Sequence, residues 1–250
     1  MAGTWQWQQQ GLTCSLLADW PHWFGSKLSY PALPAQLVSH WRQDPASAIW
    51  VHQVHGNHYL ASDQVIAMAE QPQADALVAH PSSSHSVWVS TADCVPILLA
   101  SPTGLVAAVH AGWRGTAAQI LGQVIQAFVE QGSPLHSLRA ALGPAISGEV
   151  YQVSQEVADQ VLQTIPSTLH SHVLYPDPNP GKVCLDVRQV NRLQLIASGI
   201  PAEQISLAPY CTLRHSDYFF SYRRQGSLRS GPNSLPTVQW SGIGFFPEKG

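Results

Sequence analysis

The chain has 250 residues, of which 45% are hydrophobic and only 11% charged, and its formal net charge is −3. An average soluble domain has roughly 25% charged residues, so Gln, Ser, Asn, Thr and His must supply much of the polar surface here. The chain has no basic field, so we expect no nucleic-acid partner. The apolar content, with nine Trp, excludes a disordered chain.

The length suits one domain, and we expect a single domain over residues 1–250. The longest apolar candidate, Val95–Ala100, is far shorter than the ~20 residues of a membrane span, so we expect no membrane partner. The cysteines are far apart and form no Cys-x-x-Cys pair: Cys14, Cys94, Cys184 and Cys211. They do not predict a disulfide framework, and no signal-peptide pattern is evident, so a cytoplasmic location is favoured. No feature of the sequence defines an oligomeric state.

In chain order, the polar segment 57–87 is expected to cross the surface. Short apolar runs then predict three buried strands: Val87–Thr91, Val95–Ala100 and Leu105–Val109. Hydrophobic spacing predicts a helix over Gly115–Glu130, and a second helix is predicted over Gln155–Ile165. A capping pattern at Asp186 and Gln189 predicts a third helix over Asp186–Gly199. Further strands are predicted at Leu138–Leu142, Ile205–Ala208, Tyr218–Tyr222 and Thr237–Ile243. Strands and helices interleave without regular βαβ order, which predicts an α/β (α+β) fold with mixed sheets.

Three clusters place reactive side chains where a predicted strand gives way to a loop or helix: Trp50–Gly56, Ser90–Pro96 and Ala108–Gly115. His55, Cys94 and His110 lie in these clusters. Imidazole and thiolate are ligands that Zn²⁺ prefers, and three protein ligands leave a fourth position open, as in catalytic zinc sites. The separations of 39 and 16 residues are too long for a zinc finger. Spacing alone therefore does not establish a metal site.

The same three residues also fit a cysteine nucleophile. Cys94 would attack the substrate, and His110 or His55 would hold its proton. A metal-bound thiolate is a poor nucleophile, so the two interpretations largely exclude each other.

Two arginine-containing segments are candidates for binding substrate. Arg114 precedes a predicted helix, where it would bind an anion or, alternatively, pair with a nearby acid such as Asp93. In Phe219–Arg224, strand alternation would turn either Arg223 or Arg224 toward a cleft, and the aromatic neighbours would suit a stacked planar ligand. Core packing is the alternative role for these aromatic residues.

Several motifs occur together in the order typical of one family: Gln53–Gly56, Ala74–Val78, Thr91–Pro96, Val109–Gly115, Leu142–Ile146, Cys211-Thr212 and Phe220–Arg224. On these motifs, over roughly residues 48–226, the chain resembles the YfiH family of laccase-domain or polyphenol-oxidase-like proteins. The resemblance implies a layered α/β/β/α sandwich, with a zinc ion bound by His55, Cys94 and His110.

The resemblance also implies a zinc-dependent purine nucleoside phosphorylase acting on adenosine, inosine and methylthioadenosine, with adenosine deaminase activity. Its partners would be a small-molecule nucleoside and phosphate. For deamination, water activated by zinc would attack C6 of adenine, and Asp93 would position a ligand or shuttle the proton. For phosphorolysis, Arg114 or Arg223 would hold phosphate against the ribose C1′. Gln53, beside the first histidine, is a further candidate for binding substrate.

Alternatives remain open within this resemblance. Imidazole and thiolate also bind copper, so one is a copper-dependent polyphenol oxidase. A second alternative is a cysteine-type amidase that edits peptidoglycan precursors through Cys94. A third alternative is a metal-binding protein without enzymatic activity.

The chain departs from the family pattern in two places. Trp41-Arg42 lies only eleven residues before Gln53, where the family has an Asn-Arg pair further upstream. Arg229-Ser-Gly231 replaces a Gly-Arg pair near the C-terminal end of the match. We expect these departures to affect contacts with ribose or phosphate rather than metal binding.

Overall fold

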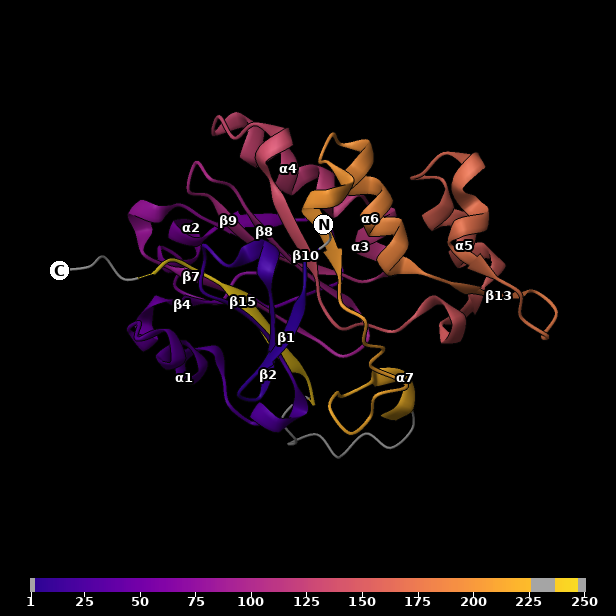
Figure 1. Cartoon of the computed structure of the whole chain (residues 1–250), viewed down its shortest axis with the longest axis horizontal. Coiled ribbons are helices and arrows are strands. Elements are labelled where there is room, and N and C mark those ends of the chain that lie inside the picture. The colour runs from indigo at the N-terminus through magenta and orange to yellow at the C-terminus, as the bar shows by residue number, and fades with distance from the viewer. Residues whose placement is uncertain (1–2, 226–236, 247–250) are drawn as a thin grey trace.

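In a computed structural model, which describes residues 3–225 and 237–246, two six-stranded sheets lie face to face (Figure 1). The strands of the first sheet, in spatial order, are β1 (Trp5–Gln8), β2 (Gly11–Cys14), β3 (His22–Gly25), β15 (Gln239–Ile243), β7 (Ser86–Thr91) and β4 (Ala48–Ile49). All neighbours pair antiparallel except β4 and β7, which pair in parallel. The last strand of the described chain, β15, therefore lies between β3 and β7.

The second sheet is also mixed. Its strands, in spatial order, are β14 (Ile205–Leu207), β10 (Arg139–Leu142), β8 (Val95–Ala100), β9 (Val106–Ala111), β6 (Ala76–Ala79) and β5 (Tyr59–Ala61). The two outermost pairs, β14 with β10 and β5 with β6, are parallel, and the others are antiparallel. A smaller antiparallel sheet contains β11 (Gln152–Ser154), β13 (Lys182–Leu185) and β12 (Leu174–Tyr175).

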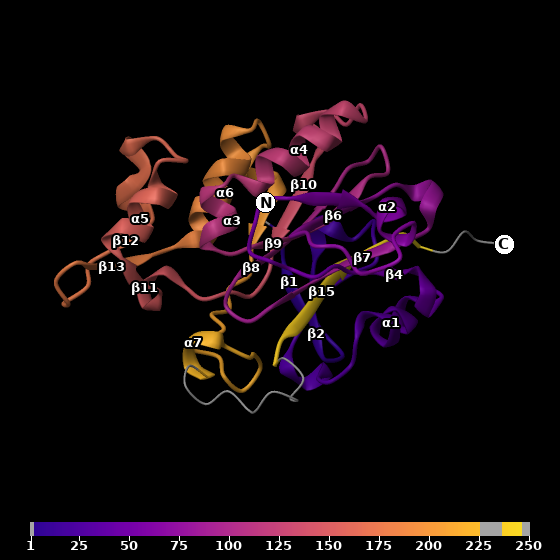
Figure 2. The same cartoon turned by 180° about the vertical axis from the view of Figure 1, so that it is seen from behind.

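Helices cover the outer faces of the two large sheets. The helices are α1 (Pro34–Leu37), α2 (Ser62–Ile66), α3 (Trp113–Ala117), α4 (Ile120–Glu130), α5 (Gln155–Leu162), α6 (Val187–Ala197) and α7 (Tyr222–Gln225). One apolar core lies between the sheets, a second lies between the second sheet and α4 and α6, and a third packs the first sheet against α1. The small sheet and α5 form one end of the molecule, and α1 and α2 lie toward the other (Figure 2). These layers confirm the predicted α/β/β/α fold with mixed sheets. No helix within the described ranges is long and apolar enough to cross a membrane.

Most of the predicted strands are found within two residues of their expected bounds, as β7, β8, β9, β10, β14 and β15. All six residues of β8 are buried, because one face of the strand lies in the core between the sheets and the other lies under the helices. Burial on both faces explains why this strand is apolar throughout rather than alternating.

The predicted cap of α6 is confirmed, since the Asp186 carboxylate accepts a hydrogen bond of 3.1 Å from the backbone N–H of Gln189. The single helix predicted over 115–130 is wrong: α3 and α4 are separated by Gln119, which has a φ of 55°. The carbonyl of Thr116 accepts from the backbone N–H of Gln119 at 3.1 Å and from the Gln194 amide at 3.0 Å, instead of from residue 120 as in a continuous helix. The tertiary hydrogen bond from Gln194 is not visible in the hydrophobic spacing.

Two further expectations are corrected. The segment 57–87 does not simply cross the surface, because it contains β5, α2 and the fully buried β6, whose four apolar residues are too few to predict a strand among polar neighbours. The strand predicted over Tyr218–Tyr222 is absent from the structure, and the chain there turns into α7. Ser221 accepts hydrogen bonds from the backbone N–H groups of Arg224 and Gln225, so it starts a helix rather than continuing a strand.

Candidate metal centre and active site

The three sequence clusters come together around one cavity of about 1250 Å³. Cluster residues lie in the segment after β4, in the turn between β7 and β8, and at the end of β9. The cavity therefore forms where both large sheets end, and α7 contributes Arg223 to its lining.

Side chains of His55, Cys94 and His110 converge in this cavity. One ligand atom from each residue lies within 4.8 Å of the ligand atoms of the other two. The two imidazole rings are nearly perpendicular, with centroids 4.7 Å apart. His110 is buried in β9, whereas His55 is exposed and has a φ of 61°. The structure thus brings together all three residues that the sequence identifies as candidate metal ligands.

Asp75 is a buried residue that connects the backbone at His55 to the side chain of His110, and sequence reasoning did not single it out. Its carboxylate is 0% exposed. It accepts hydrogen bonds from the backbone N–H groups of Val54, His55 and Gly56 at 3.3, 2.9 and 2.7 Å, and from His110 Nδ1 at 2.8 Å. Because Nδ1 of His110 donates to a carboxylate, its Nε2 is left to bind a metal ion or proton.

The electrostatics of the cluster favour a thiolate. Burial acts to raise the pKa of Cys94, but the charge of His110 and hydrogen bonds from His110 and His55 outweigh it and lower the pKa to about 6. Burial likewise opposes protonation of His110, but the charge of Cys94 and the bond to Asp75 raise its pKa to about 9. Burial also acts against ionisation of Asp75, yet bonds from His110 and Gly56 hold its pKa below the ordinary value. Without a metal, these shifts favour a thiolate on Cys94 and a proton on His110, next to the Asp75 carboxylate.

Gly112 has no side chain, and the space beside it is filled by Cys94 and His55. A Cβ atom at this position would lie 2.9 Å from Cys94 Sγ and 3.3 Å from His55 Cδ2, so a larger residue would displace them. Two imidazoles, one thiolate and a buried carboxylate that fixes one imidazole are a donor set suited to zinc or copper. The residues present therefore fit a metal ion.

Two arginines stand at the cavity without a carboxylate partner among the described residues. The Arg114 guanidinium lies 4.4 Å from the ring centroid of Trp113, and Arg223 lies 5.0 Å from that of Tyr151. Arg223 also donates to the carbonyl of Gln152 at 2.9 Å. Tyr151, which sequence reasoning missed, has its pKa raised to about 12, chiefly by burial and then by the charge of Cys94. Its hydroxyl therefore stays protonated and can donate to a ligand at neutral pH.

Asp93 is held differently from what the sequence suggested. Its carboxylate does not pair with Arg114 but accepts hydrogen bonds from Thr212, Ser221 and the backbone of Arg223. Of the two roles open to Arg114, pairing with Asp93 is thus wrong in this structure. α3 has only five residues, so an anion here would depend on the arginine side chains more than on the helix dipole.

Gln53 lines the cavity, but its amide is bound to β7. Its Oε1 accepts from the backbone N–H of Ser90 at 2.8 Å, and its Nε2 donates to the Ser90 carbonyl at 2.8 Å. These bonds fix the segment before His55 to the sheet. A role of Gln53 in binding substrate remains a prediction, and any such contact would use the rest of the side chain.

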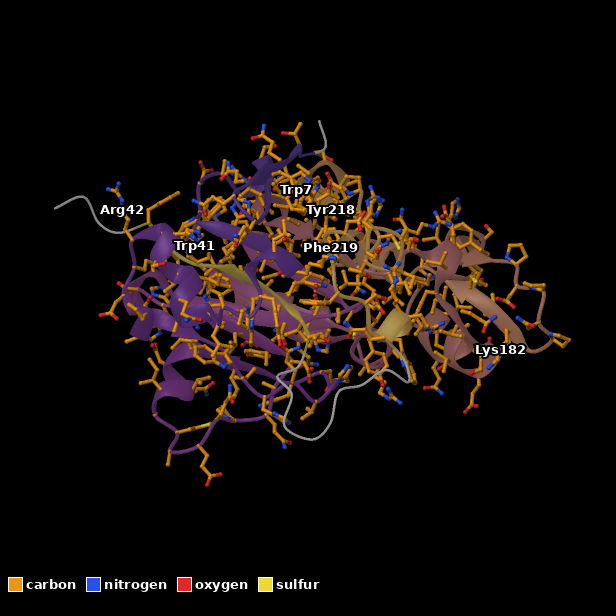
Figure 3. The ribbon with its side chains drawn as sticks, turned by 90° about the horizontal axis from the view of Figure 1, so that it is seen from below. Trp7, Trp41, Arg42, Lys182, Tyr218 and Phe219 are labelled. Atoms are coloured by element: carbon orange, nitrogen blue, oxygen red, sulfur yellow. The ribbon has the colours of Figure 1, made fainter. Side chains whose placement is uncertain are left out.

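The two departures from the family motifs lie away from the ligand cluster or outside the described residues. Trp41 stacks on Trp88, with ring centroids 4.9 Å apart. Arg42 is exposed, and its side chain points outward at one end of the molecule (Figure 3). Arg42 is not among the described residues that line the cavity. Arg229-Ser-Gly231 falls within 226–236, outside the described residues.

Known proteins match both the sequence and the fold. The family described as multi-copper polyphenol oxidoreductase laccase matches residues 34–233. A protein of Synechocystis sp. named purine nucleoside phosphorylase slr1573 is 41% identical over 265 residues, covering 96% of each chain. A protein of an unknown prokaryotic organism named adenosine deaminase RL5 is 37% identical over 58% of this chain and 55% of its own.

Solved structures agree in fold. The hypothetical protein YfiH of Bacillus licheniformis has a TM-score of 0.82 at 23% identity, covering 96% of this chain and 98% of its own. YlmD of Geobacillus stearothermophilus has a TM-score of 0.77 at 27% identity, covering 97% and 99%. The family match over residues 34–233, with the 41% identical relative, shows that the chain belongs to the multi-copper polyphenol oxidoreductase laccase family, as its motifs predict.

Proposed function

We propose that the chain is a zinc-dependent enzyme that cleaves purine nucleosides with phosphate and also deaminates adenosine. One observation carries the proposal: His55, Cys94 and His110 converge in a cavity that also holds Arg114 and Arg223, two cations without a carboxylate partner among the described residues. The relative from Synechocystis, named a purine nucleoside phosphorylase, supports the substrate class. The relative named adenosine deaminase supports the second activity.

The protein's side chains would divide the work between them. Arg114 and Arg223 would bind phosphate by charge-assisted hydrogen bonds and hold it against C1′ of the ribose. An oxygen of HPO₄²⁻ then bonds to C1′ while the bond from C1′ to the purine nitrogen breaks, and the leaving base takes up the proton that the phosphate gives up. The products are the free purine and ribose-1-phosphate. The Tyr151 hydroxyl, protonated at neutral pH, would donate a hydrogen bond to the bound phosphate or ribose.

His55, Cys94 and His110 would hold the metal ion. When bound, zinc supplies a Lewis acid that polarises a substrate oxygen or lowers the pKa of water. Asp75 would hold His110 in the tautomer that leaves Nε2 free for the metal. The Cys94 thiolate, already favoured in the metal-free cluster, would bind without first having to lose a proton at neutral pH.

The direct test is to incubate zinc-loaded, copper-free protein with adenosine and phosphate and to separate the products by chromatography. Adenine or hypoxanthine together with ribose-1-phosphate would establish phosphorolysis, and inosine alone would establish deamination only. His55→Ala should lose zinc and both activities, whereas His58→Ala, a neighbouring exposed histidine that does not line the cavity, should retain them. Unchanged adenosine with fully zinc-loaded protein would refute the proposal.

Two other functions are each favoured by one observation. The Cys94 and His110 side chains converge, and their pKa shifts favour a thiolate beside a protonated imidazole, an arrangement that would also suit a cysteine nucleophile and its base. This supports the alternative of a cysteine-type amidase, for which peptidoglycan precursors are the substrate that the family resemblance suggests. That function requires activity in metal-free protein, with Cys94→Ser inactive in the presence or absence of zinc. The family description favours copper and phenol oxidation, and copper binds such donors more tightly than zinc. Phenol oxidation that survives copper chelation would exclude that alternative.

A further inference from the structure

The Asp93 carboxylate joins the turn that carries Cys94 to the segment that carries Arg223. Thr212 Oγ1 donates to its Oδ1 at 2.5 Å. Ser221 Oγ and the backbone N–H of Arg223 donate to its Oδ2 at 3.0 and 2.7 Å. Asp93 is 8% exposed, so water competes little for these bonds. Hydrogen bonds to an ionised, buried acceptor are among the strongest in proteins.

The backbone at Asp93 is also unusual. Its φ is 94°, in the left-handed region that residues other than glycine rarely adopt. The carbonyl of Asp93 accepts from the backbone N–H of Ile146 at 3.1 Å, which fixes the peptide in this conformation. Four hydrogen bonds therefore hold the residue in a conformation that it would not otherwise prefer.

Arg223 is fixed at both of its ends as a result. Asp93 holds its backbone, and Gln152 and Tyr151 hold its guanidinium. The Asp93 carboxylate already accepts bonds from three protein donors, so it is poorly placed to exchange a proton with a substrate. The sequence left two roles open for Asp93, positioning a ligand or shuttling a proton, and these hydrogen bonds favour the first.

We infer that Asp93 is a positioning residue that fixes Arg223 for phosphate binding, next to the metal ligand Cys94, and takes no part in proton transfer. The inference rests on the proposed phosphorolysis for the identity of the anion. Asparagine tests it well, because it tolerates positive φ better than most residues. Its Oδ1 can accept from Ser221 and Arg223 while its Nδ2 donates to the Thr212 hydroxyl, which turns to accept. Alanine at this position removes all three bonds.

The experiment compares wild type, Asp93→Asn, Asp93→Ala and Asp217→Ala. Asp217→Ala removes an exposed carboxylate from the same segment and is the matched control. We expect Asp93→Ala to raise the KM for phosphate about tenfold or more, with a smaller effect on kcat, and Asp93→Asn to stay within about threefold of wild type. Thr212→Val and Ser221→Ala should each raise the phosphate KM by an intermediate amount. Asparagine as inactive as alanine, or alanine with an unchanged phosphate KM, would overturn the inference.

Hydrogen–deuterium exchange of the peptide containing Arg223 supplies a readout that does not depend on activity. The Arg223 amide should exchange slowly in wild type and Asp93→Asn and rapidly in Asp93→Ala, with zinc retained in all three. If wild type fails to cleave any nucleoside, the proposed function falls, and this exchange pattern still decides whether Asp93 fixes Arg223. Slow exchange in Asp93→Ala would then overturn the inference.

Discussion

Replacing Asp75 with asparagine removes the charge that fixes two candidate metal ligands while leaving the shape of the side chain intact. Oδ1 accepts from the His55 backbone and from His110, and Oδ2 accepts from the backbones of Val54 and Gly56. Whichever way the introduced amide turns, its NH₂ group faces two of these donors. If the NH₂ group faces Val54 and Gly56, two hydrogen bonds to a charged group are lost, each contributing about 1.5–3 kcal/mol. If it faces His55 and His110, the bond from the His55 backbone is lost, whereas His110 can change tautomer and accept.

We accordingly expect Asp75→Asn to lower the free energy of unfolding by about 1.5–6 kcal/mol. Zinc affinity should fall about 10- to 100-fold, because the His110 ring loses the charged acceptor that orients it and fixes its tautomer. If the NH₂ group of the new amide faces His110, Nδ1 becomes the acceptor and Nε2 carries the proton. Nε2 then cannot bind the ion, so the lower affinity follows from the tautomer as well as from the geometry.

Competition with a chromophoric chelator would measure zinc affinity, and urea unfolding would measure stability, at a temperature where the variant stays folded. Asp186→Asn is the matched control. Asp186 is also buried, at 3% exposed, and accepts bonds from Gln189 and Arg188, but it contacts neither histidine. It should lose stability without losing zinc affinity. Wild-type zinc affinity in Asp75→Asn would refute the reasoning that this carboxylate orients the ligands.

Gly112→Val should reduce the zinc content at saturating metal, because the new Cβ would lie 2.9 Å from Cys94 Sγ. Atomic absorption would measure the bound zinc. Gly122→Val is the control and should retain zinc, because no atom lies within 4 Å of the Cβ that it adds. Full zinc in Gly112→Val would contradict the close approach. Stability should also fall as the pH drops below about 6.5. Burial lowers the pKa of His22, so the unfolded chain binds a proton that the folded chain excludes. The difference between urea unfolding free energies at pH 7 and pH 5 should shrink in His22→Gln, and an unchanged difference would count against this explanation.

The sequence predicts the ligand cluster because its chemistry is local to three motifs, but it does not predict what holds the cluster together. Asp75 was visible as a lone acid before a short apolar run, within a motif used for the family resemblance. Its importance comes from the pairing of β6 with β9, in which Ala76 lies opposite Val109 and the His110 backbone bonds to Asp75. Single-sequence patterns do not contain that register.

The same limit explains the errors in the secondary structure. Strand β8 and helix α6 were predictable because burial on both faces and a local cap leave direct marks in the sequence. The break at Gln119 and the start of α7 combine local hydrogen bonds with partners far along the chain, Gln194 for the first and Asp93 for the second. Hydrogen bonds over such separations leave no periodic signal.

The position of β15 has a consequence for how the protein is made. During synthesis β3 and β7 leave the ribosome long before β15, so the middle of the first sheet stays open until nearly the whole described chain has emerged. Until then, β3 and β7 present unpaired backbone groups, which are sites for aggregation with other nascent chains. Closing the sheet requires contacts between residues more than 200 positions apart, such as Phe24 with Ser241, and such contacts form slowly. This layer therefore cannot be completed before β15 emerges, and a chain cut short before β15 would lack the strand that joins β3 to β7.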